Sequence, residues 1–215
     1  MDSKLFDHTI LHADATEEEV AKFCDEALKY NFMAVCVNPY YTAFVREKLR
    51  GSILNVCTVI GFPLGQMSTV AKITEAMVAI KSGTDEIDMV MNIAALKNKN
   101  YDFVREDIRR VVEVSDTVVL KIILETCLLT EEEKRIACQL VVEADADYVK
   151  TSTGFSNGGA TEADIRLMRE IVGKKIGVKA SGGIRTREDV LRMVKAGASR
   201  IGTSRAVEIF TAGEG

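Results

Sequence analysis

Four ionisable residues lie inside short segments that are otherwise apolar: Asp88 in Glu86–Met91, Lys121 in Val118–Leu124, Lys150 in Tyr148–Thr151 and Lys179 in Ile176–Ala180. A neutral lysine amine attacks carbonyl carbons and forms imines, and a carboxylate can accept and return protons. If the lysines share one apolar interior, desolvation and repulsion between like charges favour the neutral form of one of them. The residue types therefore predict covalent chemistry on a carbonyl substrate.

The elements that must position these residues are repeated βα units. Short β-branched segments alternate with segments of helical periodicity from Leu5 to Phe210. The predicted strands are Leu5–Ile10, Met33–Val37, Leu54–Ile60, Glu86–Met91, Val118–Leu124, Tyr148–Thr151, Ile176–Ala180 and Arg200–Thr203. Thr16, Thr130 and Thr161 precede acidic residues and predict helix starts, whereas Gly83 and Gly197 predict helix ends.

Eight consecutive βα units can close into a barrel or lie open as a doubly wound sheet, and periodicity does not decide between them. The count of eight favours the barrel. The chain also lacks a Gly-x-Gly-x-x-Gly segment after its first strand and a phosphate-loop motif, which are typical of nucleotide-binding open sheets. We therefore expect an α/β fold, a single-domain (β/α)8 (TIM) barrel over residues 1–215.

Alternation along the predicted fourth strand points Ile87 and Met89 toward the helices and Asp88 into the barrel. Neighbouring strands of a barrel are neighbours in sequence, so we expect three ammonium groups to crowd around this single carboxylate. A register shift of one residue would instead send some of the lysines to solvent, and ordinary interior ion pairs are another alternative. The lysines lie near strand C-terminal ends, where barrel active sites lie, and this favours catalysis.

Two glycine-containing loops follow the last predicted strands and indicate a phosphate site. Gly182, Gly183 and Arg185 follow the seventh strand, and Ser204 follows the eighth. Backbone N–H groups at glycines, together with hydroxyl and guanidinium groups, suit a phosphate at this corner of a barrel. The alternative is that these segments are simple tight turns, for which glycine is the usual residue.

Several motifs resemble those of the deoxyribose-phosphate aldolase family, in the same order along nearly the whole chain. They are Asp7–Leu11, Gly61–Gly65, Asp85–Val90, Lys121–Thr126, Val149–Phe155 and Val178–Arg185. The resemblance implies that Lys150 forms the Schiff base, that Lys179 tunes its protonation and that Asp88 takes part in proton transfer. It also places three supporting residues in the site: Lys121, Thr9 and Asp7.

The reaction implied by the resemblance is the reversible cleavage of 2-deoxy-D-ribose 5-phosphate into acetaldehyde and D-glyceraldehyde 3-phosphate, with neither a metal nor an organic cofactor. Two positions depart from the family pattern. His12 stands where lysine is common, and Arg205 stands where a second small hydroxyl residue is more usual. The departure at Arg205 leaves open how strongly the site binds phosphate.

Composition excludes several other classes. A formal net charge of -4 gives no reason to expect nucleic acid. Five widely spaced cysteines suggest reduced thiols, and His8 and His12 are too few for a metal site. No apolar run approaches the roughly 20 residues of a membrane span, and Met1–Lys4 begins no signal-like stretch, so we expect a cytoplasmic protein. The expected partners are a phosphosugar and aldehydes, and homodimer and homotetramer stay open.

Two other functions suit the same residues. One is a phosphosugar isomerase or synthase that works by acid–base chemistry without a covalent intermediate, because one scaffold supports many chemistries. The other is a phosphosugar-binding protein without catalysis. A trapped imine would favour the aldolase over the isomerase or synthase. Release of an aldehyde would favour the aldolase over the binding protein.

Overall fold

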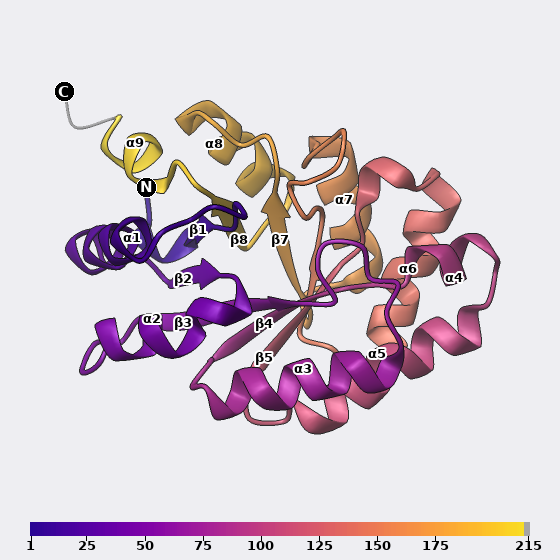
Figure 1. Ribbon diagram of the computed structural model, residues 1–215. Helices are drawn as coiled ribbons and strands as arrows, with labels where there is room; N and C mark the ends of the chain where they lie inside the picture. The colour runs from indigo at the N-terminus through magenta and orange to yellow at the C-terminus, as the bar shows by residue number, and fades with distance from the viewer. Residues whose placement is uncertain (213–215) are drawn as a thin grey trace.

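A closed barrel of eight parallel strands forms the centre of the molecule, as the computed structural model of residues 1–212 shows (Figure 1). The strands pair in chain order, and β1 closes the barrel against β8. Their bounds are β1 Phe6–Ile10, β2 Ala34–Val37, β3 Asn55–Ile60, β4 Glu86–Val90, β5 Val119–Ile123, β6 Tyr148–Lys150, β7 Gly177–Ser181 and β8 Arg200–Thr203. The predicted (β/α)8 barrel is confirmed; residues 213–215 of the predicted domain lie outside the described residues.

Helices surround the barrel on its outer side (Figure 1). Their bounds are α1 Glu17–Tyr30, α2 Thr42–Lys48, α3 Thr69–Lys81, α4 Ile93–Lys97, α5 Tyr101–Val114, α6 Glu131–Glu143, α7 Glu162–Val172, α8 Arg187–Ala196 and α9 Ala206–Thr211. Short 3-10 helices cover Ser3–Leu5, Pro39–Tyr41 and Thr126–Leu128. None of the helices within residues 1–212 combines the length and the hydrophobicity that a membrane crossing requires.

The ends of the helices follow from local chemistry, as predicted. The hydroxyls of Thr16, Thr130 and Thr161 accept backbone N–H groups of the first helical turn. In the first two cases a glutamate completes a capping box. Gly83 and Gly197 both have positive φ where α3 and α8 end, a conformation that glycine adopts without steric cost.

Because side chains alternate along the strands, they fill two separate spaces: the core between the strands and the helices, and the inside of the barrel. Outward-facing apolar side chains pack against the helices and form the main core, in which Ile87, Met89 and Val178 are fully buried. Inside the barrel, β2 and β3 contribute a small apolar cluster that includes Cys36 and Cys57. The remaining strands direct charged side chains into the barrel, and these form the site described below.

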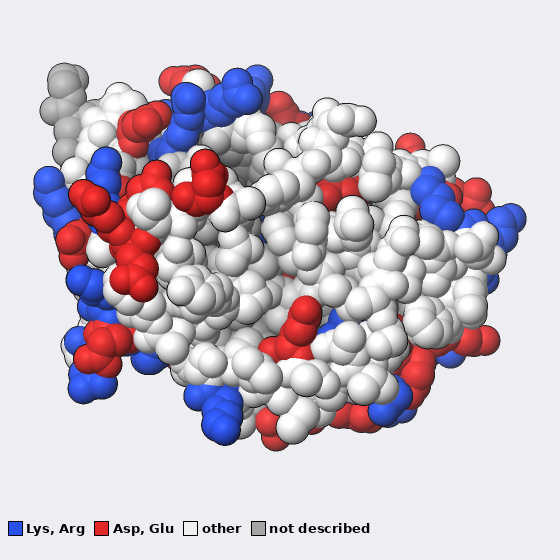
Figure 2. Space-filling view, viewed as in Figure 1, with Lys and Arg blue, Asp and Glu red and all other residues white. Residues whose placement is uncertain are grey.

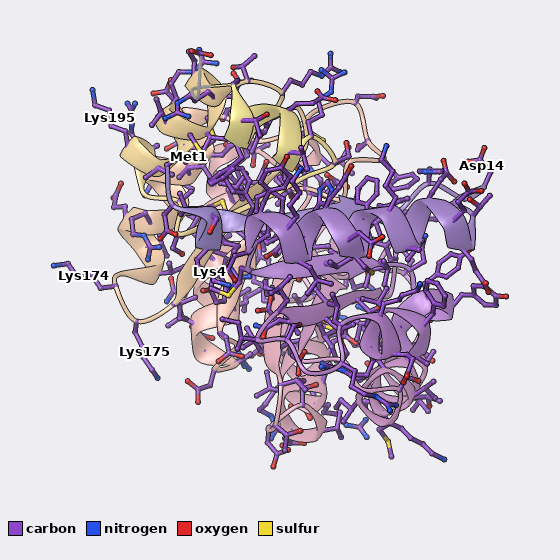
Figure 3. The ribbon with its side chains drawn as sticks, turned by 90° about the vertical axis from the view of Figure 1, so that its left-hand side faces the viewer. Met1, Lys4, Asp14, Lys174, Lys175 and Lys195 are labelled. Carbon is purple, nitrogen blue, oxygen red and sulfur yellow. The ribbon has the colours of Figure 1, made fainter. Side chains whose placement is uncertain are left out.

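The loops after the strands gather at one end of the barrel, and the loops before the strands gather at the other. Figure 3 shows this polarity: Asp14, which follows β1, lies at the opposite end from Lys174 and Lys175, which precede β7. In barrel enzymes the end that follows the strands holds the active site.

Candidate active site

Asp88 lies at the centre of the barrel and contacts all three predicted lysines. Its Oδ1 is 2.8 Å from Lys121 Nζ, and its Oδ2 is 2.7 Å from both Lys150 Nζ and Lys179 Nζ. The strand register explains this convergence, since Asp88 pairs with Lys121 on β5 and Lys150 pairs with Lys179 on β7. The predicted inward direction of the four side chains is confirmed.

The expected crowding of three ammonium groups around Asp88 is confirmed, but two further carboxylates share these groups. Asp7 Oδ2 lies 2.5 Å from Lys179 Nζ, and Glu86 Oε2 lies 2.6 Å from Lys121 Nζ. Arg200, at the start of β8, contacts both of these carboxylates: its Nη1 lies 2.5 Å from Asp7 Oδ1, and its Nη2 lies 3.1 Å from Glu86 Oε1. The barrel interior is an alternating network of charges rather than a cluster of cations.

These contacts fix the charge states of the most deeply buried lysines. Burial lowers the pKa of Lys179, but the Asp7 and Asp88 carboxylates together raise it by more than burial lowers it. The net pKa is therefore above the usual value. Burial also lowers the pKa of Lys121, but Asp88 and the other acidic groups around it together raise it by more, so its net pKa is above the usual value. Burial raises the pKa of Asp88, yet the three lysines hold it well below the usual range. Lys121 and Lys179 therefore remain protonated near neutral pH.

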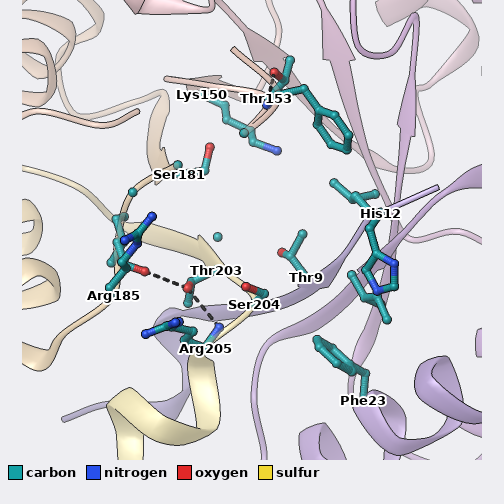
Figure 4. A pocket seen from close by; sticks show the side chains of 18 residues that line it. Thr9, His12, Phe23, Lys150, Thr153, Ser181, Arg185, Thr203, Ser204 and Arg205 are labelled. Atoms are coloured by element: carbon teal, nitrogen blue, oxygen red, sulfur yellow. Dashed lines mark hydrogen bonds between the residues drawn. The ribbon is translucent and has the colours of Figure 1, made fainter. Parts of the chain in front are cut away.

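Lys150 differs from the other two lysines in that it reaches a cavity. A hollow of about 590 Å³ opens at the end of the barrel that follows the strands, and Lys150 is the lysine in its wall among residues 1–212 (Figure 4). The side chains of Lys121 and Lys179 are fully buried beneath it. On the face seen in Figure 2, charged side chains lie mainly near the edge and uncharged ones cover the middle. A small molecule in the cavity would meet the amine of Lys150.

The predicted phosphate residues line the same cavity: Gly182, Gly183, Arg185 and Ser204. Gly182 and Gly183 have φ values of 81° and 76°, so both need the freedom of glycine. A Cβ at Gly159 would lie 2.2 Å from the carbonyl oxygen of Gly182, so the loops after β6 and β7 pack directly on each other.

Figure 4 places Arg185, Ser204 and Arg205 on the opposite side of the cavity from His12, with Lys150 at its end. Both departures from the family pattern, His12 and Arg205, thus belong to the cavity wall. His12 Nδ1 is 2.8 Å from Asp14 Oδ1, and the His12 side chain is about half exposed.

The remaining predicted residues divide between the cavity and its floor. Thr9 lines the cavity, and its hydroxyl donates to the Asp7 carbonyl at 2.9 Å. The Asp7 side chain lies below the cavity, in contact with Lys179. His8 points away from the barrel interior toward Glu26, whose Oε2 lies 2.7 Å from His8 Nε2, so His8 lies outside the site.

Sequence reasoning missed Glu86 and Arg200, although a signal for Glu86 was present. Glu86 lies two residues before Asp88, so alternation directs both to the same side of β4. Arg200 is the first residue of β8, two residues before the inward-facing Gly202. A Cβ at Gly202 would lie 3.0 Å from Lys179 Cε, so this glycine leaves room for the lysine stem.

Two groups of residues bring possible metal ligands together: Cys36, Cys57 and Asp88, and Asp7, Cys57 and Glu86. All are buried, and the ligand atoms of each group lie within 4.8 Å of one another. Both oxygens of Asp88 already contact ammonium groups, as do those of its neighbours. A metal cation there would face these positive charges, so the donor set does not suit one.

Comparison with known proteins gives the family. The model of the DeoC/LacD family of aldolases matches residues 3–211. A deoxyribose-phosphate aldolase of Finegoldia magna is 55% identical over 207 residues, covering 96% of this chain and 97% of that protein. The Brevibacillus brevis deoxyribose-phosphate aldolase is 56% identical over 209 residues, covering 97% and 95%.

Solved structures agree with this relationship. A putative deoxyribose-phosphate aldolase from Coccidioides immitis is 43% identical, with a TM-score of 0.97 and coverage of 99% of this chain and 85% of that one. A tetrameric deoxyribose phosphate aldolase from Aeropyrum pernix is 32% identical, with a TM-score of 0.92 and coverage of 99% and 90%. The chain belongs to the DeoC/LacD family of aldolases.

Proposed function

We propose that this protein is a class I aldolase that reversibly cleaves 2-deoxy-D-ribose 5-phosphate into acetaldehyde and D-glyceraldehyde 3-phosphate, with Lys150 as the Schiff-base lysine. The observation that carries the proposal is the position of Lys150. Its Nζ lies 2.7 Å from a carboxylate oxygen of Asp88, in the wall of a cavity that the glycine loops also line. A lysine so placed can meet a carbonyl group while a proton acceptor lies beside it.

The reaction follows from the electron sink that an imine provides. The neutral amine of Lys150 attacks C1 of the open-chain sugar, and the resulting carbinolamine takes up a proton and loses water to give a protonated imine. The C3 hydroxyl then loses its proton, the C2–C3 bond breaks, and its electrons move to the imine nitrogen. This step releases D-glyceraldehyde 3-phosphate and leaves an enamine. Protonation at C2 and addition of water then free acetaldehyde and regenerate the amine.

The other buried groups have supporting roles in this proposal. Asp88 touches Lys150 and two further lysines, so we assign it proton transfer at the reacting carbons and the amine. Lys179 places a permanent positive charge beside the same carboxylate oxygen of Asp88, so this oxygen does not need the charge of Lys150 to neutralise it. Lys121 does the same at the second oxygen, and Thr9 contributes a hydroxyl in the cavity wall.

The phosphate of the substrate is assigned to the wall formed by Gly182, Gly183, Arg185 and Ser204. Backbone N–H groups at such glycines and charge-assisted bonds from arginine are the usual means of holding a phosphate. Arg205 lies in the same wall and adds a second guanidinium group within the cavity. The relatives from Finegoldia magna and Brevibacillus brevis are deoxyribose-phosphate aldolases, which supports this assignment.

We also propose a homo-oligomer built from one compact domain over residues 1–215. Val70, Met77 and Val78 lie on one face of α3 and are 57–62% exposed, which gives a second copy an apolar surface to cover. The related Aeropyrum pernix enzyme is a tetramer. The five free cysteines suit a reducing compartment, and we propose the cytoplasm. Sedimentation at micromolar concentration would distinguish dimer from tetramer.

Turnover provides the test of function. Purified protein is mixed with 2-deoxyribose 5-phosphate, and glyceraldehyde 3-phosphate is measured with a dehydrogenase that reduces NAD⁺. We expect stoichiometric release of acetaldehyde and the triose phosphate. Saturable binding of the phosphosugar without aldehyde release would instead identify a binding protein, and a rearranged phosphosugar would identify an isomerase.

A further inference from the structure

The charges inside the barrel form a closed ring. Starting from Arg200, each successive contact joins opposite charges, and the last returns to Arg200. The order is Arg200, Asp7, Lys179, Asp88, Lys121, Glu86 and Arg200, with distances of 2.5, 2.5, 2.7, 2.8, 2.6 and 3.1 Å. The ring holds three cations and three carboxylates, and their side chains are at most 6% exposed. It is therefore neutral without any help from Lys150.

Lys150 is the surplus cation of this interior. It touches the ring at one point, Asp88, whereas Lys121 and Lys179 each contact two carboxylates. Arginine does not deprotonate in proteins. When one proton leaves the interior, its loss from Lys150 breaks one ion pair and leaves three cations opposite three carboxylates. Its loss from either of the other lysines would break two.

We infer that Arg200 is a positioning residue that acts through Asp7 and Glu86 to keep the amine of Lys150 neutral. Arg200 supplies the third permanent cation of the ring, so the carboxylates do not need Lys150 as a counter-ion. This inference rests on the proposed function, since it explains how the Schiff-base lysine becomes nucleophilic. Arg200 itself lies at the start of β8, at the far end of the barrel from the cavity, and is not among the residues that line it.

Other polar side chains that face this interior come from β2 and β3. Besides the seven charged residues, β2 and β3 contribute Cys36 and Cys57, and Cys57 Sγ lies 3.5 Å from Lys121 Nζ. Burial raises the pKa of Cys57 well above its usual value, so this thiol adds no charge near neutral pH. Asn55 donates to Glu86 at 2.7 Å and is neutral. The pKa of Cys36, by contrast, is lowered, mainly by a hydrogen bond with Cys57. Neither thiol changes among the variants below, so the differences in charge among them come from the ring and Lys150.

The first test is the pH dependence of kcat/KM, which reports ionisations of the free enzyme. In Arg200→Met, two ring cations face three carboxylates, so the positive charge of Lys150 becomes the required counter-ion. The acid limb should move upward by about one pH unit, with activity recovering at alkaline pH. Glu86→Gln removes a carboxylate instead and should move the same limb downward. Arg200→Lys keeps the charge and should stay near the wild-type profile.

The double variant R200M/E86Q separates electrostatics from structure. It contains three lysines and two carboxylates, which restores one surplus cation, so the acid limb should return toward the wild-type position. A purely structural role predicts instead that the two losses accumulate. Unchanged acid limbs in both single variants, or a double variant shifted as far as R200M, would overturn the inference. If R200M does not fold, the downward shift of E86Q carries the test, and its absence would refute the inference.

Lys72→Met is the matched control. Lys72 is also fully buried and forms a 2.6 Å ion pair with Asp107, but this pair joins α3 to α5 outside the barrel. We expect a lower melting temperature with an unchanged pH profile. Borohydride trapping of acetaldehyde on the wild-type protein is run in parallel. Without a trapped lysine adduct the proposed function fails, whereas an adduct with pH profiles insensitive to Arg200 refutes only the role of the ring.

Discussion

At the scale of single residues, three lysines of the same interior have different environments. Lys121 and Lys179 lie below the cavity between pairs of carboxylates, and Lys150 reaches the cavity with a single carboxylate contact. Position and number of partners thus distinguish a nucleophile from two permanent cations, although all three have the same side chain.

Lys150→Ala should reduce kcat by at least about 10³-fold, because within residues 1–212 no other lysine lines the cavity to form the imine. The folded structure should persist, since Lys150 makes only one ion pair and its loss leaves the ring neutral. Steady-state kinetics and a thermal melt measure the two effects. Activity near that of the wild type would remove Lys150 from the mechanism.

Asp88→Asn tests proton transfer separately from imine formation. The amide keeps the shape of the side chain but cannot accept and return a proton, so exchange of deuterium into the methyl group of acetaldehyde should fall more than borohydride trapping does. Exchange is followed by NMR, and trapping by mass spectrometry. If both fall together with the melting temperature, Asp88 is only the counter-ion of three lysines.

At the scale of elements, the loops after β6, β7 and β8 form the phosphate wall. The close approach of Gly159 to Gly182 holds the first two loops together, and Thr203 donates to the Ile184 carbonyl at 2.9 Å to join the third. These contacts fix the glycine backbone before a ligand arrives, which lowers the cost of binding.

The phosphate wall predicts strong selection for the phosphorylated sugar. If a few charge-assisted hydrogen bonds contribute about 1.5–3 kcal/mol each, kcat/KM for unphosphorylated 2-deoxyribose should be lower by several orders of magnitude. Ser204→Ala should narrow this difference while leaving the reaction of the unphosphorylated sugar unchanged. Equal kcat/KM values for the two sugars would show that the wall does not bind phosphate.

The sequence predicts the elements better than it predicts the network inside them. All eight strands lie within one residue of the predicted ends, because β-branched alternation and helix caps are local signals. Asp88 and the three lysines follow from the same alternation. The contact of Arg200 with Asp7 does not, because it spans 193 residues and exists only when β8 closes against β1. The pattern of charges along single strands therefore does not predict the closed ring of ion pairs that includes Arg200.

At the scale of the whole molecule, the buried carboxylates predict sensitivity to acid. Burial raises the pKa of Asp7, but Lys179 and Arg200 lower it by more, so that its net pKa is about 2. The pKa of Asp88 is also lowered. A carboxylate with a depressed pKa stabilises the fold above its unfolded pKa of roughly 4, and this contribution is lost as the pH falls toward the folded value. The free energy of unfolding should therefore decrease between pH 4 and pH 2.

Urea unfolding at a series of pH values measures this dependence. Asp7→Asn should be less stable than the wild type at pH 7 and should lose less stability between pH 4 and pH 2, because one of the responsible carboxylates is absent. A wild-type stability that stays constant over this range would contradict the depressed pKa values and the charge assignments of the ring.

The central claim is that Lys150, among the lysines of the barrel, forms a covalent imine with the substrate. The most direct measurement is reduction of the protein with borohydride in the presence of acetaldehyde, followed by peptide mapping with mass spectrometry. Reduction of the imine adds a two-carbon group to the lysine. We predict one modified peptide per chain, with the group on Lys150. Modification of Lys121 or Lys179 instead, or no added mass at all, would contradict the mechanism.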